Sequence, residues 1–118
     1  HVSYLFTVRE GKLSCLLFQR SADVGCGVPF NIASASLFTH MLAHICNLKP
    51  GELVYTLGDA HIYLNHIEQL EQQCTRIPRP FPTIEISSDI REINEFTSDS
   101  IILHSYHPQR RIKLKMAV

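Results

Sequence analysis

Residues 19–34 contain several side chains that could bind an anion and a polar ring. Arg20 and Ser21 offer a guanidinium fork and a hydroxyl, which together match phosphate oxygens. Asn31 carries a donor and an acceptor side by side, which suits the edge of a pyrimidine. Taken singly, these residues also read as an exposed arginine, a loop serine and a helix-capping asparagine. Together they are compatible with a site for a phosphate and a flat heterocycle, or with a well-capped loop, and both interpretations stay open at this point.

Two glycines, Gly25 and Gly27, flank Cys26 within the same segment. Glycine permits positive φ angles and lets a ligand approach the backbone closely. The pattern is too short for a dinucleotide-binding fingerprint, which also needs a strand before it. By itself it predicts only a loop before a helix.

His61 and Tyr63 lie two residues apart in a strand-like segment, so both should point to one face, which Asp59 shares. An imidazole and a phenol on one face could bind a sugar hydroxyl. The alternative is a polar strand face in contact with solvent.

His40 and His44 have the i, i+4 spacing of metal ligands on a helix. No glutamate follows His40 as a metalloprotease helix requires, and no third ligand suggests itself. We therefore interpret both as packing or interface histidines, and the sequence predicts no metal.

The elements that position these groups can be read from hydrophobic periodicity. A hairpin is predicted from strands at residues 2–8 and 12–20, with turn chemistry between them. The apolar run at 15–18 indicates a strand covered on both faces. A second long strand is predicted at 52–64, with Gly58 as a bulge or a point of close approach.

A helix is predicted over residues 30–46, with Pro29 in its first turn. Its apolar stripe is expected to comprise Ala33, Leu37, Met41, His44 and Ile45.

A shorter helix is predicted at 66–76, with Ile67, Leu70 and Cys74 on one side. Strands are expected at 83–86, 101–107 and 111–118, and a helical turn or loop at 93–100. Strands in hairpins and across helices indicate an α+β domain.

Composition narrows the class of protein. The 118 residues suffice for one domain with one core, and a hydrophobic content of 45% argues against disorder. Eleven basic and eleven acidic residues balance, so no bulk charge attracts DNA, RNA or a membrane surface. There is no membrane-length apolar run and no signal-peptide pattern, and the four cysteines are not paired by spacing. We expect a cytoplasmic protein with free thiols.

Four blocks carry a family resemblance: FQRSADVGCGVPFNIAS, LGDAHIYLNHIE, RIPRPFP and the terminal KMAV. In this order, they resemble the C-terminal half of thymidylate synthase, and the similarity runs along the whole chain. The resemblance implies a layered α+β fold in which a mixed sheet packs against helices and one sheet face forms a dimer interface. Residues 1–118 would then be the C-terminal part of a single domain.

The family converts dUMP to dTMP with 5,10-methylenetetrahydrofolate as cosubstrate, giving dihydrofolate. A cysteine thiolate adds to C6 of the uracil, and the folate supplies both the carbon unit and the hydride. The resemblance also implies a homodimer in which each site borrows arginines from the partner subunit. No metal is implied.

The resemblance assigns roles to individual residues. Asn31 is expected to select uracil over cytosine, and His1, Asn31 and Asp23 are expected to support catalysis. Residues 116–118 are expected to close over the ligands and exclude water. The residues expected to bind dUMP are Gln19, Arg20, Ser21, Asp23, Asn31, His61 and Tyr63. Those expected to bind folate are Asp23, Gly27, Phe30, Met116 and Ala117.

Several departures from the family accompany the resemblance. The nucleophilic cysteine is expected immediately before His1, so we expect the isolated chain to be inactive without the N-terminal part of the protein. Ala35 stands where a tyrosine is common, and Cys26 where a larger aliphatic is usual. Both changes would alter the base and folate pockets.

Two alternatives remain open at this stage. A deoxycytidylate hydroxymethylase shares the fold but prefers an acidic residue at the position of Asn31. A non-catalytic module for nucleotide or RNA is the second, although neutral charge makes RNA binding the weaker reading. A fusion to a dihydrofolate reductase domain also stays open.

Overall fold

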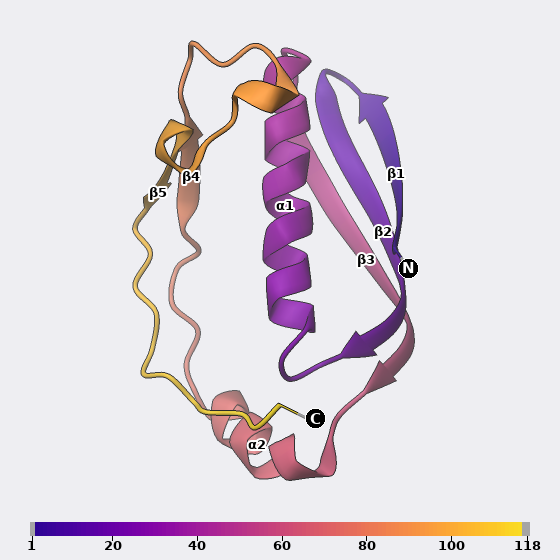
Figure 1. The fold of residues 1–118 in the computed structure, drawn as a ribbon, viewed down its shortest axis with the longest axis vertical. Helices are drawn as coiled ribbons and strands as arrows, with labels where there is room; N and C mark the ends of the chain where they lie inside the picture. Colours follow the sequence, from indigo (N-terminus) through magenta and orange to yellow (C-terminus); the bar gives the residue numbers. More distant parts are fainter. Residues whose placement is uncertain (1, 117–118) are drawn as a thin grey trace.

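The computed structural model describes residues 2–116, and a three-stranded mixed sheet forms its largest element. Strands β1 (Val2–Arg9) and β2 (Lys12–Asp23) form the antiparallel hairpin, and β3 (Lys49–His61) pairs with β2 in parallel. The helix α1 (Val28–Ile45) connects β2 to β3 and packs on one face of the sheet (Figure 1). A parallel pair needs such a crossover because its strands run the same way. The expected α+β arrangement is confirmed.

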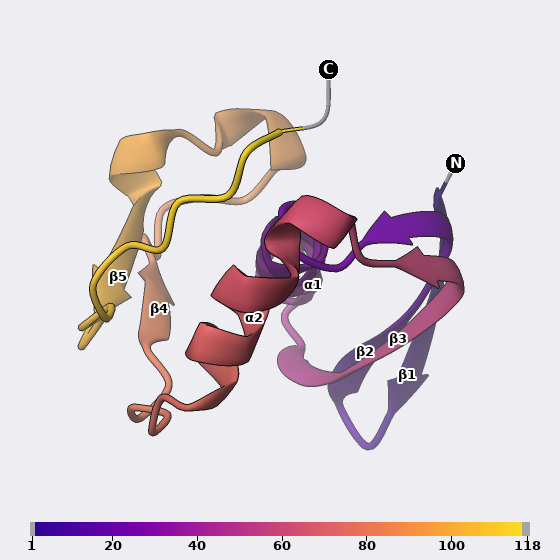
Figure 2. The same ribbon diagram turned by 90° about the horizontal axis from the view of Figure 1, so that it is seen from below.

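The rest of the chain forms a second layer on the far side of α1. Strands β4 (Thr83–Ile86) and β5 (Ile101–His104) pair antiparallel, and Figure 2 shows them and the large sheet on opposite sides of α1. The helix α2 (Ile67–Cys74) follows β3 through the short 3-10 helix η1 (Leu64–His66).

Of the two remaining predicted segments, the helical turn is present and the last strand is not. The turn expected at 93–100 comprises two 3-10 helices, η2 (Ile93–Glu95) and η3 (Ser98–Ser100). The strand expected at 111–118 is wrong for the described residues 111–116, which form no strand. Residues 111–116 alternate between apolar and polar side chains as a strand would, but no described strand lies beside them to pair with.

The contact between β2 and β3 is close at Gly58. A Cβ on Gly58 would lie 2.6 Å from the carbonyl oxygen of Arg20, so Gly58 is a point of close approach, as one of the two expectations had it. The register irregularity lies elsewhere. Leu13 pairs with Pro50 and Cys15 with Leu53, so β3 has one extra residue there.

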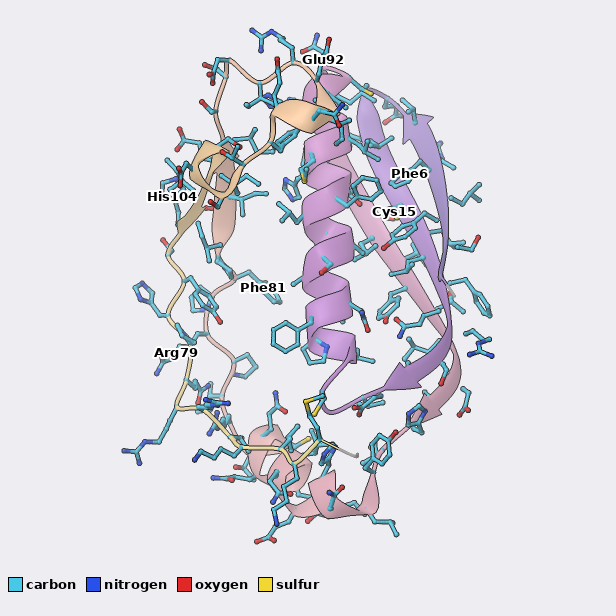
Figure 3. The ribbon with its side chains drawn as sticks, in the orientation of Figure 1. Phe6, Cys15, Arg79, Phe81, Glu92 and His104 are labelled. Atoms are coloured by element: carbon cyan, nitrogen blue, oxygen red, sulfur yellow. The ribbon has the colours of Figure 1, made fainter. Side chains whose placement is uncertain are left out.

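The core lies between β2 and α1. Leu13, Cys15, Leu17 and Ala22 are buried on the strand, and Figure 3 shows Cys15 on the side that faces the helix. From the helix, Ala35, Thr39 and Ala43 are buried, so the expected stripe is wrong. The helix is apolar around most of its circumference, and the sheet packs against the smallest side chains because they allow the closest approach.

The opposite face of the sheet is exposed. Leu16 and Phe18 are 41% and 44% exposed, whereas Cys15 and Leu17 are 1% exposed. The expectation that this run is covered on both faces is therefore wrong within the chain, where side chains alternate between a buried and an open face. Leu5 and Val54 also lie among the exposed apolar side chains.

The short helix α2 also turns a different face inward than expected. Ile67 is 42% exposed and Cys74 is exposed, so only Leu70 of the expected trio is partly covered. His66, just before the helix, is completely buried instead.

Among the described residues, no helix has both the length and the apolarity to span a bilayer.

Candidate functional site

Three side chains from three elements form a hydrogen-bonded chain beside the start of α1. The hydroxyl of Tyr55 on β3 donates to Oε1 of Gln19 on β2. Nε2 of Gln19 then donates to Oδ1 of Asn31 at 3.2 Å and to the carbonyl of Ser21 at 2.8 Å. The pKa of Tyr55 is raised by burial and by the nearby Tyr4, so the hydroxyl keeps its proton and stays a donor. Gln19 and Asn31 are therefore brought together as expected.

Asn31 does not cap the helix. The N-cap is Gly27, and the amide nitrogen of Asn31 donates to the Gly27 carbonyl at 3.0 Å as part of the first turn. Its side-chain amide is bound by Gln19 instead. Capping is the usual reason for an asparagine at the start of a helix, and the Asn31 side chain does not have this function here.

Asp23 organises the loop that leads into the helix. Its Oδ1 accepts hydrogen bonds from the amides of Gly25 at 3.0 Å and Cys26 at 3.3 Å. A Cβ on Gly27 would lie 3.1 Å from the Asp23 carbonyl and 3.4 Å from Oδ1 of Asn31. In the described residues, Gly11 is the glycine with a positive φ, so Gly25 and Gly27 provide space and not the positive φ that the sequence suggested.

His61 and Tyr63 lie together, although the strand ends at His61 and not at the expected residue 64. Their ring centroids are 5.5 Å apart at near-perpendicular planes. Nδ1 of His61 donates to the Asp59 carbonyl at 3.2 Å, which leaves Nε2 as an acceptor. The amide of Val24 donates to the His61 carbonyl at 3.0 Å, so this pair is tied to the Asp23 loop.

Arg20 and Ser21 are both exposed at the end of β2. Within residues 2–116, no ion pair or side-chain hydrogen bond engages the Arg20 guanidinium. By strand alternation its side chain lies on the opposite face from Gln19. The structure does not join Arg20 to Asn31 directly, and their common ligand stays a prediction.

A cavity of about 650 Å³ lies between the start of α1, α2 and the C-terminal segment. Of the residues expected on the folate side, Phe30 and Met116 line it. Gly25, Cys26 and Leu114 also line it, as do Arg76, Arg110 and Arg111. Asp23 and Gly27 lie beside the loop that forms its wall. His1, Ala117 and Val118 lie outside the described residues.

Two residues of this region escaped the sequence analysis. His66 is completely buried, and its Nε2 donates to the Lys115 carbonyl at 2.6 Å. Tyr55 fixes Gln19 from the neighbouring strand. Tyr55 could have been found from its parity with Leu53 and Leu57 on β3, whereas nothing in the local pattern marks His66.

The histidines of α1 have packing contacts. Nε2 of His44 donates to the Ile90 carbonyl at 3.1 Å, and its ring lies against Phe96. His40 lines an apolar cavity of about 670 Å³ between α1 and the β4–β5 pair, and burial lowers its pKa. His44 thus has packing contacts and His40 lies at the interface between α1 and the β4–β5 pair, in agreement with the interpretation of both as packing or interface residues.

Comparison with known proteins gives one consistent result. The family model described as Thymidylate synthase matches residues 1–118. Thymidylate synthase of Saimiriine herpesvirus 2 (strain 11) is 57% identical over 118 residues, and that of Ascaris suum is 55% identical. The enzyme of Equine herpesvirus 2 is 51% identical. All of this chain is aligned in each case, and it spans about 40% of the length of these relatives.

Proposed function

The chain belongs to the thymidylate synthase family, and we propose that it acts as the C-terminal part of a single-domain enzyme that methylates dUMP to dTMP. The observation that carries the proposal is the Tyr55–Gln19–Asn31 chain of hydrogen bonds. It holds an amide with one donor and one acceptor beside a cavity, and the helix does not need that amide as a cap. Uracil presents the complementary acceptor and donor at O4 and N3.

The remaining dUMP contacts follow from the exposed ends of the strands. Arg20 and Ser21 would hold the phosphate, since the guanidinium has no competing carboxylate among the described residues. His61 and Tyr63 would bind the sugar hydroxyl, with Nε2 of His61 as the acceptor. His1 would support the nucleophilic cysteine expected immediately before it, which supplies the covalent step.

The size and lining of the cavity support 5,10-methylenetetrahydrofolate as the proposed cosubstrate. Its volume of about 650 Å³ is in the range of small-molecule sites, and its lining combines apolar side chains with arginines that suit a carboxylate tail. The folate would supply the carbon unit and the hydride. Asp23 and Gly27 would contact its ring, Phe30 would pack against it, and Met116 and Ala117 would exclude water from above.

The proposed whole enzyme is a homodimer. The radius of gyration is 16.3 Å, whereas a compact domain of this length is expected at about 13.5 Å. The chain also exposes large apolar side chains that its own elements do not cover. The open sheet face, with Leu5, Leu16, Phe18 and Val54, would pack against a second copy of the chain. The N-terminal part of the protein would fill the cavity between α1 and the β4–β5 pair.

The test uses the full-length protein, two nucleotides and one nucleoside. Equilibrium binding is measured for dUMP, dCMP and deoxyuridine, together with release of dTMP and dihydrofolate. We expect dUMP to bind most tightly, Arg20→Ala to reduce its advantage over deoxyuridine, and Asn31→Asp to reduce its advantage over dCMP. Arg9→Ala and Asn65→Asp are matched exposed controls.

Each failure has a separate meaning. A preference of the unmodified protein for dCMP contradicts the uracil assignment. Binding of dUMP without any turnover by the full-length protein points to a non-catalytic module.

A further inference from the structure

Asp23, Cys26 and His66 converge from three elements on one point beside the cavity. One ligand atom from each, a carboxylate oxygen, the thiol sulfur and an imidazole nitrogen, lies within 4.8 Å of the other two. Asp23 ends β2, Cys26 lies in the loop before α1, and His66 precedes α2. The three types together are a typical donor set for zinc.

His66 is prepared to act as a ligand. It is fully buried, and its Nε2–H donates to the Lys115 carbonyl at 2.6 Å. That bond fixes the tautomer, so Nδ1 carries a bare lone pair, and Nδ1 has no hydrogen-bond partner among the described residues. A backbone carbonyl on the other ring nitrogen is the usual support of a metal-ligating histidine.

Gly25 keeps the lone pair of Nδ1 accessible. A Cβ at position 25 would lie 2.9 Å from Nδ1 and would block its approach. The amides of Gly25 and Cys26 both bind Oδ1 of Asp23, which holds the carboxylate in place and leaves Oδ2 for another partner. An unpaired buried nitrogen costs free energy, so a group that binds it is expected to stabilise the loop.

We propose that Asp23, Cys26 and His66 bind a divalent cation of the zinc class. Tetrahedral zinc holds nitrogen, oxygen and sulfur ligand atoms roughly 3.3–3.6 Å apart, so the three atoms, which lie within 4.8 Å of one another, must close by at most about 1.5 Å. Binding replaces the S–H bond of Cys26 by a metal–thiolate bond and releases one proton to solvent. Cys26 also lines the cavity, so the proposed site lies at its wall.

Occupancy would inhibit the enzyme, a consequence that rests on the proposed function. The cation takes the Asp23 carboxylate that the folate ring would otherwise meet. It also places a charge at the cavity wall beside Phe30. The site is thus inhibitory and is not part of catalysis.

The test measures metal binding to the full-length protein directly. Cobalt(II) is added with dUMP present to cover the upstream nucleophile, and thiolate-to-cobalt absorption in the near ultraviolet is recorded. Zinc affinity is measured by competition with a chromophoric chelator. We expect Cys26→Ser to abolish the absorption and to weaken zinc by at least about tenfold. Cys46→Ser, at an exposed cysteine, is the matched control and should change neither.

His66→Asn removes a second ligand, and its folding is checked by circular dichroism before titration. Equal zinc affinity in the unmodified protein and in Cys26→Ser overturns the proposal. Turnover is measured separately with and without zinc. Binding at Cys26 with unchanged turnover contradicts the inhibition, and with it the placement of folate, but leaves the metal site intact.

Discussion

Nε2 of Gln19 lies 3.2 Å from Oδ1 of Asn31, and this contact fixes which way the Asn31 amide points. Gln19 is itself oriented, because the Tyr55 hydroxyl donates to its Oε1. The Asn31 amide therefore keeps its Nδ2 donor and one Oδ1 lone pair for a ligand. Cytosine presents the opposite pattern of donor and acceptor to uracil, so under the proposed function base selection would depend on Gln19, which orients the Asn31 amide.

Replacing Gln19 by Glu tests this orientation. A carboxylate cannot donate to Oδ1 of Asn31, but it can accept from Nδ2 if the amide turns over. The preference for dUMP over dCMP should then fall by about tenfold or more, since an unpaired buried polar group costs about 1–3 kcal/mol. Binding constants for both nucleotides to the full-length protein measure the ratio.

The matched control for this charge change is Gln72→Glu, at an exposed position of α2. It should leave the ratio as it is. A ratio unchanged in Gln19→Glu would show that Asn31 orients without Gln19.

Gly58→Ala should separate β2 from β3. The added Cβ would lie 2.6 Å from the Arg20 carbonyl, an atom of rigid backbone that cannot move aside cheaply. We expect a loss of about 1–3 kcal/mol in the free energy of unfolding, measured by denaturant titration. Gly11→Asn, where a Cβ meets nothing within 4 Å and φ is +73°, should cost much less. Equal costs for the two variants would contradict this account.

Glu10→Asn should stabilise the β1–β2 hairpin. Glu10 and Gly11 have φ angles of 51° and 73° in a two-residue turn, which asparagine adopts more readily than glutamate. The ion pair with Arg9 that is lost is long and fully solvated, so it contributes little. An increase of up to about 1 kcal/mol in the free energy of unfolding is expected. A lower denaturation midpoint would show that the ion pair outweighs the backbone conformation.

Stability should depend on pH through His40. Partial burial of His40, on the side of α1 that faces β4 and β5, lowers its pKa below the usual 6.5, so the unfolded chain takes up the proton first. The contribution to stability is constant above the unfolded pKa and is lost as pH falls below it. His40→Leu should remove that loss, seen as a smaller difference in melting temperature between pH 7.5 and pH 5.5. His107→Leu, at an exposed site, is the control and should leave the difference unchanged.

The sequence predicted correctly those helices and strands whose hydrophobic pattern is compatible with only one type of secondary structure. The hairpin, the first helix, the third strand and the short β4 and β5 strands lie where periodicity and turn residues put them, within a few positions. The helix stripe was wrong because an almost uniformly apolar helix such as α1 does not indicate which side faces the sheet. Ala35 and Ala43 face the sheet because small side chains allow close packing, and this depends on the shape of the sheet surface, which the helix sequence does not contain.

In the candidate site, too, contacts between residues close in the sequence could be predicted, whereas contacts between distant residues could not. Gln19 and Asn31, twelve residues apart, are adjacent because a strand end and a helix start meet at the loop between them. His66 and Lys115 are 49 residues apart, and their hydrogen bond depends on the path of the C-terminal segment, for which no local pattern exists. The residue types of Arg20, Ser21, His61 and Tyr63 suggested contacts to a phosphate and to a sugar, and the family resemblance joined them into one nucleotide site.

The strand order β1-β2-β3 places the longest strand at the border of the sheet. Among the described residues no strand pairs with the outer side of β3, so a row of backbone donors and acceptors along its 13 residues remains available. Pro50, near its beginning, lacks an N–H, and the residues that follow have no such block. Any preparation of this segment by itself should therefore tend to polymerise through this border, unless another strand of the same polypeptide covers it first.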